Sequence, residues 1–370
     1  GRVGSNVTAM YTSRSVRQLY PCMKDLEHAR ILVAPLDWGL GHATRCIPVV
    51  RALLRRGAVP VIGADAGPLA LLRSEFPDLE HVRIPGLHIR YARGPSQLWS
   101  MVKQFPAMWR TMHEERQLFD RIAGSLKLDA VISDQRFGIR SDEVPSVLIT
   151  HQVFPFTPTA QAALRRLNLH LISRFDACWI MDHAEPPGLA GELSHGAQLP
   201  ANARYIGPRS RFKAQAIDPE EEPYAIVAVI SGPEPQRSLL EELLKEQMQR
   251  IPGPHLLVRG LPEQQGSERA SQVRMVPHLG GEELARVLRR ARMIVSRTGY
   301  TTLMDLDALG RTALVIPTPG QEEQEYLGRL HAKTGRFLVQ HQDRIDVSAA
   351  WIKLYNAPRC PTAEGEELLE

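Results

Sequence analysis

A histidine stands in a turn near the start of the chain, between an apolar run and a helical pattern. The run is Ile31–Ala34, the turn is Gly39-Leu40-Gly41-His42-Ala43-Thr44-Arg45, and apolar residues at helical spacing follow from Cys46 to Leu54. Glycines let the backbone approach a ligand, the start of a helix offers unpaired N–H groups, and an imidazole exchanges protons near neutral pH. The turn therefore indicates proton transfer by His42 on a phosphorylated substrate.

Two other interpretations of this turn remain open. A dinucleotide-binding fingerprint needs a third glycine three residues after Gly41, and Thr44 stands there, although Asp65 ends the next strand at about the expected distance. A redox enzyme is therefore weakly supported. An ordinary strand-to-helix turn that carries a surface histidine is also compatible with these residues.

Polar residues follow two other expected strands of the first half. Asp134-Gln135-Arg136 comes directly after residues 130–133, and His151-Gln152 comes directly after 146–150. The carboxyl ends of parallel strands lie at one edge of a sheet, so these groups are expected on the same side as His42. We expect Asp134 to orient the His42 imidazole, the role that a carboxylate plays beside a catalytic base. The alternative for Asp134 is a helix N-cap.

The elements that must hold these residues form two series. Short β-branched runs alternate with amphipathic patterns of helical length, which is typical of parallel sheets with crossover helices. The chain of 370 residues exceeds the usual size of one core. We therefore expect an α/β fold of two doubly wound, Rossmann-like domains that face each other across a cleft, with ligands at the strand ends. The expected strands are 31–34, 59–62, 130–133, 146–150 and 177–181 in the first series, and 225–230, 255–258, 293–296 and 313–316 in the second.

A polar stretch that contains several prolines separates the two series and is expected to be a linker. The helical pattern at 347–355 is a candidate to pack back across the cleft. The expected division is a polar N-terminal extension (1–28), part of which can derive from cloning, a first domain (29–208), the linker (209–223), a second domain (224–346), and a C-terminal helix with an acidic tail (347–370).

Composition argues against several classes of protein. The longest apolar runs are strand-sized, so no membrane-spanning helix is expected. The 4 cysteines lie far apart, which predicts neither disulfides nor a zinc site and favours a reducing, cytoplasmic location. Residues 1–210 hold 25 Lys and Arg against 18 Asp and Glu, while 211–370 hold 20 against 23, which favours an anionic partner or membrane surface at the first half. Because the net charge is only +4 and no basic run is interleaved with aromatic residues, nucleic-acid binding is not expected.

The second half carries a similar turn. Residues 293–296 lead into Arg297-Thr298-Gly299-Tyr300-Thr301-Thr302, where the start of a helix can hold an anion, and Asp305 follows one turn later. A carboxylate there can accept hydrogen bonds from a ribose diol, or it can only offset the helix dipole. After the next strand, Pro317–Tyr326 gathers amides and carboxylates that suit sugar hydroxyls, although a solvated helix start has the same composition.

These motifs, in this order, resemble a known family. The chain resembles the GT-B glycosyltransferases of the MurG type in four motifs: GxGHxxR at Gly39–Arg45, Ser231-Gly232, SRTG at Ser296–Gly299 and PxPGQEEQEY at Pro317–Tyr326. In that family a glycine-rich loop with a histidine faces a lipid-linked acceptor, and the second domain holds a UDP-sugar. The resemblance implies that Asp305 contacts the ribose. It implies an acceptor side of Gly39, Gly41, Arg45, Arg136, His151 and Gln152, and a donor side of Ser231, Gly232, Arg237, Arg259, Val276, His278, Thr298, Gly299, Tyr300, Thr301, Asp305, Gln321, Gln324 and Glu325.

The chain departs from the family at two places. Glu325 stands where the family has the second residue of a Gln-Gln pair that contacts the donor sugar. The resemblance implies N-acetylglucosamine as that sugar, but a carboxylate only accepts hydrogen bonds and would select sugar hydroxyls differently. Pro233-Glu234-Pro235 replaces a glycine-rich stretch at the diphosphate.

The implied reaction is an inverting displacement. His42 deprotonates an acceptor hydroxyl, which attacks the anomeric carbon as UDP leaves from the opposite face. The helix start at Gly299, together with Arg237, would stabilise the leaving diphosphate, so no metal or other cofactor is expected. The expected partners are a nucleotide-sugar donor and a lipid-linked acceptor at the cytoplasmic face of a membrane.

Two rival functions stay open. The first turn, read as GxGHxxRC, also resembles PseG-type nucleotide-sugar hydrolases, where the histidine activates water. A nucleotide-sugar-binding protein without turnover is the third alternative. We favour the transferase because residues 97–112 combine large apolar groups with Lys103 and Arg110, and such a segment can lie at a bilayer surface. Core packing is the alternative for this segment, because Pro106 is expected to interrupt its helix.

Overall fold

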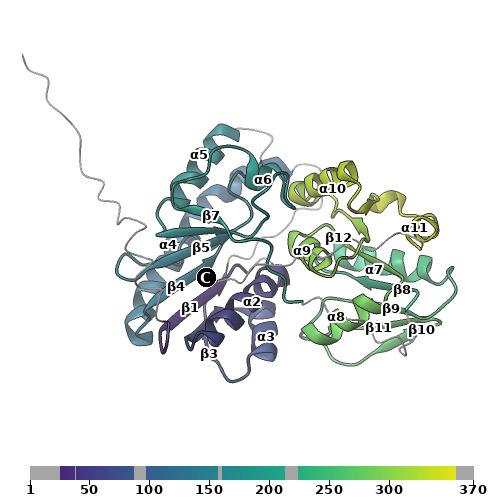
Figure 1. Ribbon diagram of the computed structural model, residues 1–370, viewed down its shortest axis with the longest axis horizontal. Helices are drawn as coiled ribbons and strands as arrows, with labels where there is room; N and C mark the ends of the chain where they lie inside the picture. Colours follow the sequence, from purple (N-terminus) through teal and green to yellow (C-terminus); the bar gives the residue numbers. More distant parts are fainter. Residues whose placement is uncertain (1–25, 38, 87–96, 157–160, 213–223, 356–370) are drawn as a thin grey trace, which may run out of the picture.

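The computed structural model describes residues 26–37, 39–86, 97–156, 161–212 and 224–355, and of residues 97–109 it describes the backbone. Two seven-stranded sheets, each covered by helices, lie side by side (Figure 1). We call residues 26–212 the first unit and residues 224–355 the second unit.

The sheet of the first unit has the order β3-β2-β1-β4-β5-β6-β7, and its neighbouring strands are all parallel. Strand order reverses between β1 and β4, where Pro35 pairs with Asp134. In open parallel sheets a ligand crevice lies at such a reversal, beyond the carboxyl ends of the strands. The elements are β1 (Arg30–Pro35), α2 (Leu40–Arg55), β2 (Val59–Ala64), α3 (Ala66–Glu75), β3 (Glu80–Arg83), α4 (Gln97–Leu126), β4 (Ala130–Asp134), β5 (Ser146–Thr150), α5 (Gln161–Ile172), β6 (Ala177–Ile180), α6 (Glu192–His195) and β7 (Ala203–Tyr205).

The sheet of the second unit has the order β10-β11-β9-β8-β12-β13-β14, with β10 antiparallel to β11 and the other pairs parallel. Its reversal lies between β8 and β12; Ser231 follows the end of β8 by two residues, and Thr298 follows β12 directly. The elements are β8 (Ile226–Val229), α7 (Gln236–Met248), β9 (His255–Val258), β10 (Glu268–Ala270), β11 (Val273–Val276), α8 (Gly281–Arg290), β12 (Met293–Arg297), α9 (Tyr300–Ala308), β13 (Leu314–Ile316), α10 (Glu322–Thr334), β14 (Leu338–Val339), a 3-10 turn (Gln342–Arg344) and α11 (Val347–Leu354). The expected fold of two doubly wound sheets is therefore confirmed.

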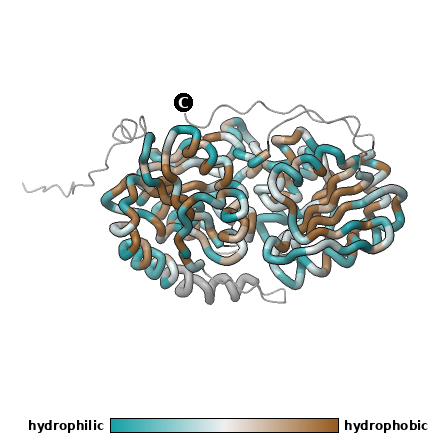
Figure 2. The backbone as a smooth tube through the Cα atoms, turned by 90° about the horizontal axis from the view of Figure 1, so that it is seen from below, coloured by the Kyte–Doolittle hydropathy of each residue, from teal (hydrophilic) through white to brown (hydrophobic). Residues whose placement is uncertain are grey.

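The central strands are buried on both faces. In β1, Ile31 and Val33 belong to the apolar cluster that α2 covers, whereas Leu32 and Ala34 pack with Phe119 of α4 on the opposite face. Figure 2 shows the resulting hydrophobic interior of each unit. A strand that packs on two faces needs apolar residues at every position, which explains why these runs do not alternate.

Two expectations about helices are corrected. The helix α4 continues through Pro106, because a proline removes one backbone hydrogen bond without ending a helix of 30 residues. The helix α11 does not cross the cleft; Val347 and Ala350 pack into the core of the second unit beside Leu244 of α7, and the backbone N–H of Val347 donates to Gln247.

Candidate active site

His42 lies in the first turn of α2, directly beyond the carboxyl end of β1. The preceding Gly39 has φ 105°, a backbone conformation that side chains with a Cβ rarely adopt, and no atom lies within 4 Å of where its Cβ would be. Gly39 is therefore required by the shape of the turn. The turn brings the imidazole over the reversal point of the first sheet.

The expected contact between His42 and Asp134 is present. The Nδ1 atom of His42 lies 3.1 Å from Oδ2 of Asp134, which ends the neighbouring strand β4. Arg45, one turn along α2, donates from Nε to the same oxygen at 2.7 Å and from Nη2 to Oδ1. Asp134 has 0% and Arg45 1% of the side chain exposed, against 16% for His42. The buried salt bridge of Arg45 with Asp134 thus supports the more accessible imidazole.

This arrangement keeps His42 neutral near pH 7. Burial and the charge of Arg45 lower the pKa of His42, and they outweigh the opposite effect of Asp134. Burial disfavours ionised Asp134, but Arg45 and His42 overcome that effect and lower its pKa to about 2. Within the described residues, Nε2 of His42 has no hydrogen-bond partner. Nη2 of Arg45 also lies 2.9 Å from Nδ1 of His42. Because a guanidinium only donates, the tautomer with Nδ1–H requires Nη2 to bind Asp134 alone. In that tautomer Nδ1 donates to Asp134, and Nε2 is available as a general base.

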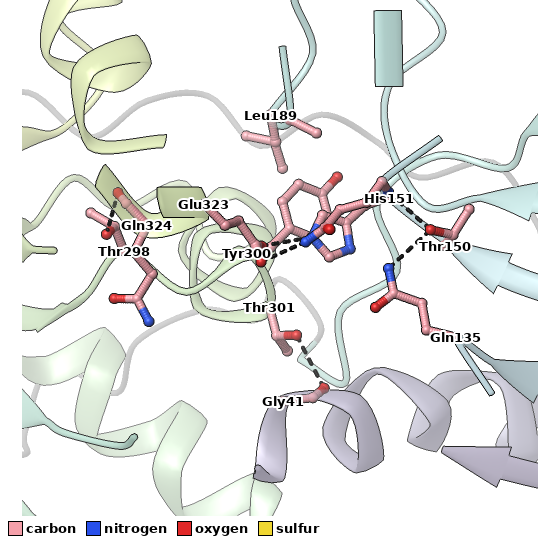
Figure 3. Close-up of polar contacts among 12 residues, drawn as sticks. Gly41, Gln135, Thr150, His151, Leu189, Thr298, Tyr300, Thr301, Glu323 and Gln324 are labelled. Carbon is pink, nitrogen blue, oxygen red and sulfur yellow. Dashed lines mark hydrogen bonds and ion pairs between the residues drawn. The ribbon is translucent and has the colours of Figure 1, made fainter. Parts of the chain in front are cut away.

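His151 joins the two units. Nη1 of Arg45 lies 2.7 Å from Nδ1 of His151, and because a guanidinium only donates, Nδ1 must accept and Nε2 must carry the proton. Nε2 then donates to Oε1 of Glu323, on α10 of the second unit, at 2.8 Å. Gln152 donates to the other oxygen of Glu323 at 2.5 Å. Figure 3 shows Glu323 pointing at His151, while Gln324 points away.

Helix α9 contacts the same edge of the first unit. The ring of Tyr300 stacks on His151, and its hydroxyl donates to the carbonyl of Met181. Thr301 donates to the carbonyl of Gly41 at 3.0 Å, and a Cβ at Gly41 would lie 3.2 Å from the Thr301 hydroxyl (Figure 3). The space over Gly41, expected to accommodate a ligand, is thus occupied by the second unit.

The expected sugar-contacting segment is strongly hydrogen-bonded within itself. Oε1 of Gln324 accepts from both the backbone and the hydroxyl of Thr318 at 3.0 Å, and its amide donates to Gln321. The hydroxyl of Thr298 donates to the carbonyl of Gln324 at 2.9 Å, and Glu325 accepts from the backbone of Gly320 at 2.8 Å. These bonds tie the start of α10 to the start of α9.

Asp305 is buried beneath the segment that connects the units. Its Oδ1 accepts from the hydroxyl of Ser210 at 2.5 Å, and its Oδ2 lies 3.7 Å from Nε of Arg211. Burial raises the pKa of Asp305 despite these neighbours, and burial together with Arg211 lowers the pKa of His278. Asp305 thus already binds a hydroxyl, although one from the chain itself.

Three arginines predicted in the site are paired elsewhere. Arg136 donates to Glu115 at 2.8 Å and to the carbonyls of Ile84 and Pro85 at 3.1 and 2.7 Å. Arg237 donates to Glu234 and Glu241, and Nε of Arg259 lies 2.9 Å from Glu241. A role of Arg237 or Arg259 at a diphosphate would require these ion pairs to open.

The remaining predicted residues surround the reversal point of the second sheet. Gly232 follows β8 with φ 119° and open space where its Cβ would be, next to Ser231. Gly299 is the N-cap of α9, and Val276 ends β11 as a buried residue. The described residues contain no group of histidines, cysteines and acids arranged to hold a metal ion. None of the helices in the described part of the chain is long and apolar enough to cross a membrane.

Several solved structures of glycosyltransferases are similar in fold to this chain. The glycosyltransferase SnogD from Streptomyces nogalater is 16% identical, with a TM-score of 0.60 over 89% of this chain and 91% of that chain. The calicheamicin glycosyltransferase CalG4 is 13% identical (TM-score 0.58, 89% and 90% covered), and MurG of Acinetobacter baumannii is 14% identical (TM-score 0.52, 89% and 91% covered). No family model matches the sequence, and a comparison with curated proteins gives no significant match. The chain therefore has the GT-B fold.

Proposed function

We propose that this protein transfers a sugar from a nucleotide-sugar donor to a hydroxyl group of an acceptor, with inversion at the anomeric carbon. The contact between His42 and Asp134, placed at the reversal point of the first sheet of a GT-B fold, carries this proposal. The GT-B architecture supports it, because the solved structures named above are glycosyltransferases.

The reaction is a single displacement. In the reactive tautomer, Nδ1–H of His42 and Nη2 of Arg45 both donate to Asp134, and Nε2 of His42 takes the proton of the acceptor hydroxyl. The acceptor oxygen forms a bond to the anomeric carbon as the bond from that carbon to the diphosphate breaks, and the electron pair leaves with the nucleoside diphosphate. Proton transfer by a positioned base contributes a rate factor of about a hundred to ten thousand.

The donor is proposed to be a UDP-sugar that resembles UDP-N-acetylglucosamine. Backbone N–H groups at the start of α9, after Gly299, are suited to the diphosphate. A ribose diol would bind Asp305 by displacing the hydroxyl of Ser210. Because the start of α9 supplies the anion-stabilising groups, the transfer is proposed to need no metal, and EDTA is expected to leave its rate unchanged.

The acceptor is proposed to be lipid-linked and reached at the cytoplasmic face of a membrane. The excess of basic residues in 1–210 supports this, as do the residue types at 97–112. Flotation of the full chain with anionic vesicles tests the idea, with neutral vesicles as the control. If the chain does not float with anionic vesicles at low salt, the lipid part of the proposal is wrong.

The decisive assay measures UDP release from a panel of UDP-sugars, with and without a lipid extract as the source of acceptor. Release that requires the extract, and that His42→Ala abolishes, supports transfer. Release without any acceptor would identify a hydrolase in which His42 activates water. Donor binding without release would identify a nucleotide-sugar-binding protein. The anomeric configuration of the product, read by NMR coupling constants, tests inversion.

A further inference from the structure

The charges around His42 do not balance within the first unit alone. Arg45 holds Asp134 through two hydrogen bonds, so the positive charge of the guanidinium offsets the carboxylate that should stabilise a protonated His42. The thiol of Cys46, 3.9 Å from Asp134, stays uncharged because burial and Asp134 raise its pKa. A proton taken up by His42 would therefore leave a net positive charge in a buried place.

The missing negative charge comes from the second unit. Glu323 accepts the Nε2–H of His151 at 2.8 Å, and Nδ1 of His151 accepts from Arg45 at 2.7 Å. Burial disfavours the ionised form of Glu323, but His151, His42 and Arg45 overcome this and lower its pKa. Tyr300 also belongs to the second unit and stacks on His151. It is neutral because burial raises its pKa well above its usual range.

With Glu323 in place, the cluster of Arg45, Asp134 and Glu323 carries one net negative charge while both histidines are neutral. It becomes neutral when His42 accepts a proton. We infer that Glu323 is a positioning residue for the proposed transfer: through His151 and Arg45 it supplies the charge that balances protonated His42, so the base is complete only when the units are closed. This inference rests on the proposed function and adds to it a coupling between the donor-side unit and the proton transfer.

The test is the Glu323→Gln variant, whose amide can still accept from His151 while Gln152 turns its own amide to match. Removing the charge should lower kcat about tenfold, leave the donor KM within about twofold, and move the acid limb of kcat down by about one pH unit. Glu323→Asp, which keeps the charge, should retain the wild-type limb within about half a unit. Glu246→Gln makes the same chemical change at an exposed carboxylate of α7, outside the site, and should leave the profile unchanged.

An NMR titration of the histidine rings reads the same coupling without any activity. The titration midpoint of His42 should fall by about one pH unit in Glu323→Gln and stay unchanged in Glu246→Gln. His151 should carry its proton on Nε2 in the wild type. Equal midpoints for His42 in wild type and Glu323→Gln, or a raised KM with unchanged kcat, would overturn the inference. If no UDP-sugar is turned over, the proposed function fails, and the titration still decides whether Glu323 acts on His42.

Discussion

The imidazole of His151 lies flat against the phenol ring of Tyr300, with ring centroids 4.1 Å apart and planes 5° apart. The two residues belong to different units, and both are buried. Tyr300 also donates to the carbonyl of Met181, so a single residue of α9 contacts the first unit through its ring and its hydroxyl. The contact between the units is therefore centred on His151, which also lies 2.7 Å from Arg45, the residue beside His42.

Replacing Tyr300 by Phe should lower the free energy of unfolding by about 1 kcal/mol, because the buried carbonyl of Met181 loses its donor while the stacked ring remains. Tyr300→Leu should cost about 1 kcal/mol more, since stacking is lost as well. Urea unfolding followed by circular dichroism measures both. Tyr224→Phe is the control, because the Tyr224 hydroxyl makes no hydrogen bond within the described residues; an equal loss there would refute the assignment.

Asp134→Asn should reduce turnover at least about a hundredfold with little change in affinity for UDP. An amide can donate to Nδ1 of His42, which favours the tautomer whose Nε2 is already protonated. Steady-state kinetics and calorimetric titration with UDP separate the two effects. Unchanged turnover would rule out the orienting role of Asp134, and circular dichroism should accompany the assay because Arg45 loses its buried partner.

Turnover should depend on pH through an acid limb that lies below pH 6.5. Burial and Arg45 lower the pKa of His42, so the neutral base persists to a lower pH than in a free histidine. The same shift affects the free energy of unfolding. Below pH 6.5 His42 binds a proton in the unfolded chain but stays neutral in the folded one, so the free energy of unfolding falls as the pH drops from 6.5. Rate and unfolding profiles from pH 4.5 to 8 measure this, and an acid limb above 6.5 would contradict it.

Asp134 affects stability at lower pH. Its pKa of about 2 in the fold lies below the usual value of 3.8. The stability that ionised Asp134 contributes is therefore present above about pH 4 and is lost as the pH falls toward 2. Urea unfolding of wild type and Asp134→Asn between pH 2 and 5 should show the difference between them shrinking, and a constant difference would be inconsistent with this shift.

Gly39 and Gly41 should respond differently to alanine. Gly39→Ala strains a backbone with φ 105° and should destabilise the fold by about 1 kcal/mol or more. Gly41 lies in helical backbone, so Gly41→Ala should leave stability nearly unchanged, yet its Cβ presses on the hydroxyl of Thr301 and should lower turnover. Adding Thr301→Ala removes that hydroxyl and should restore part of the lost rate. Turnover that is no higher in the double variant would show that the approach of α9 does not matter.

Most of the secondary structure could be predicted locally. The nine expected strands are present because each is an apolar run bounded by turn residues, a pattern set by its own neighbourhood. The short strands β3, β7, β10 and β14 escaped prediction because each lies at a sheet edge, where burial on one side no longer demands an apolar run. The strand β11 was also not predicted, although Val276 at its end was expected among the donor-side residues.

By itself, the sequence determined that two doubly wound sheets form and that His42, Asp134 and His151 follow strand ends, since parallel strands place their carboxyl ends along one edge. Only the tertiary structure decided which partner each polar group takes. Arg45 bridges Asp134 and His151, Arg237 pairs with Glu241, and Glu323 crosses from the second unit to a histidine 172 positions away. A hydrogen bond depends on where two side chains meet in space, and no local pattern of residues encodes how one unit packs against the other.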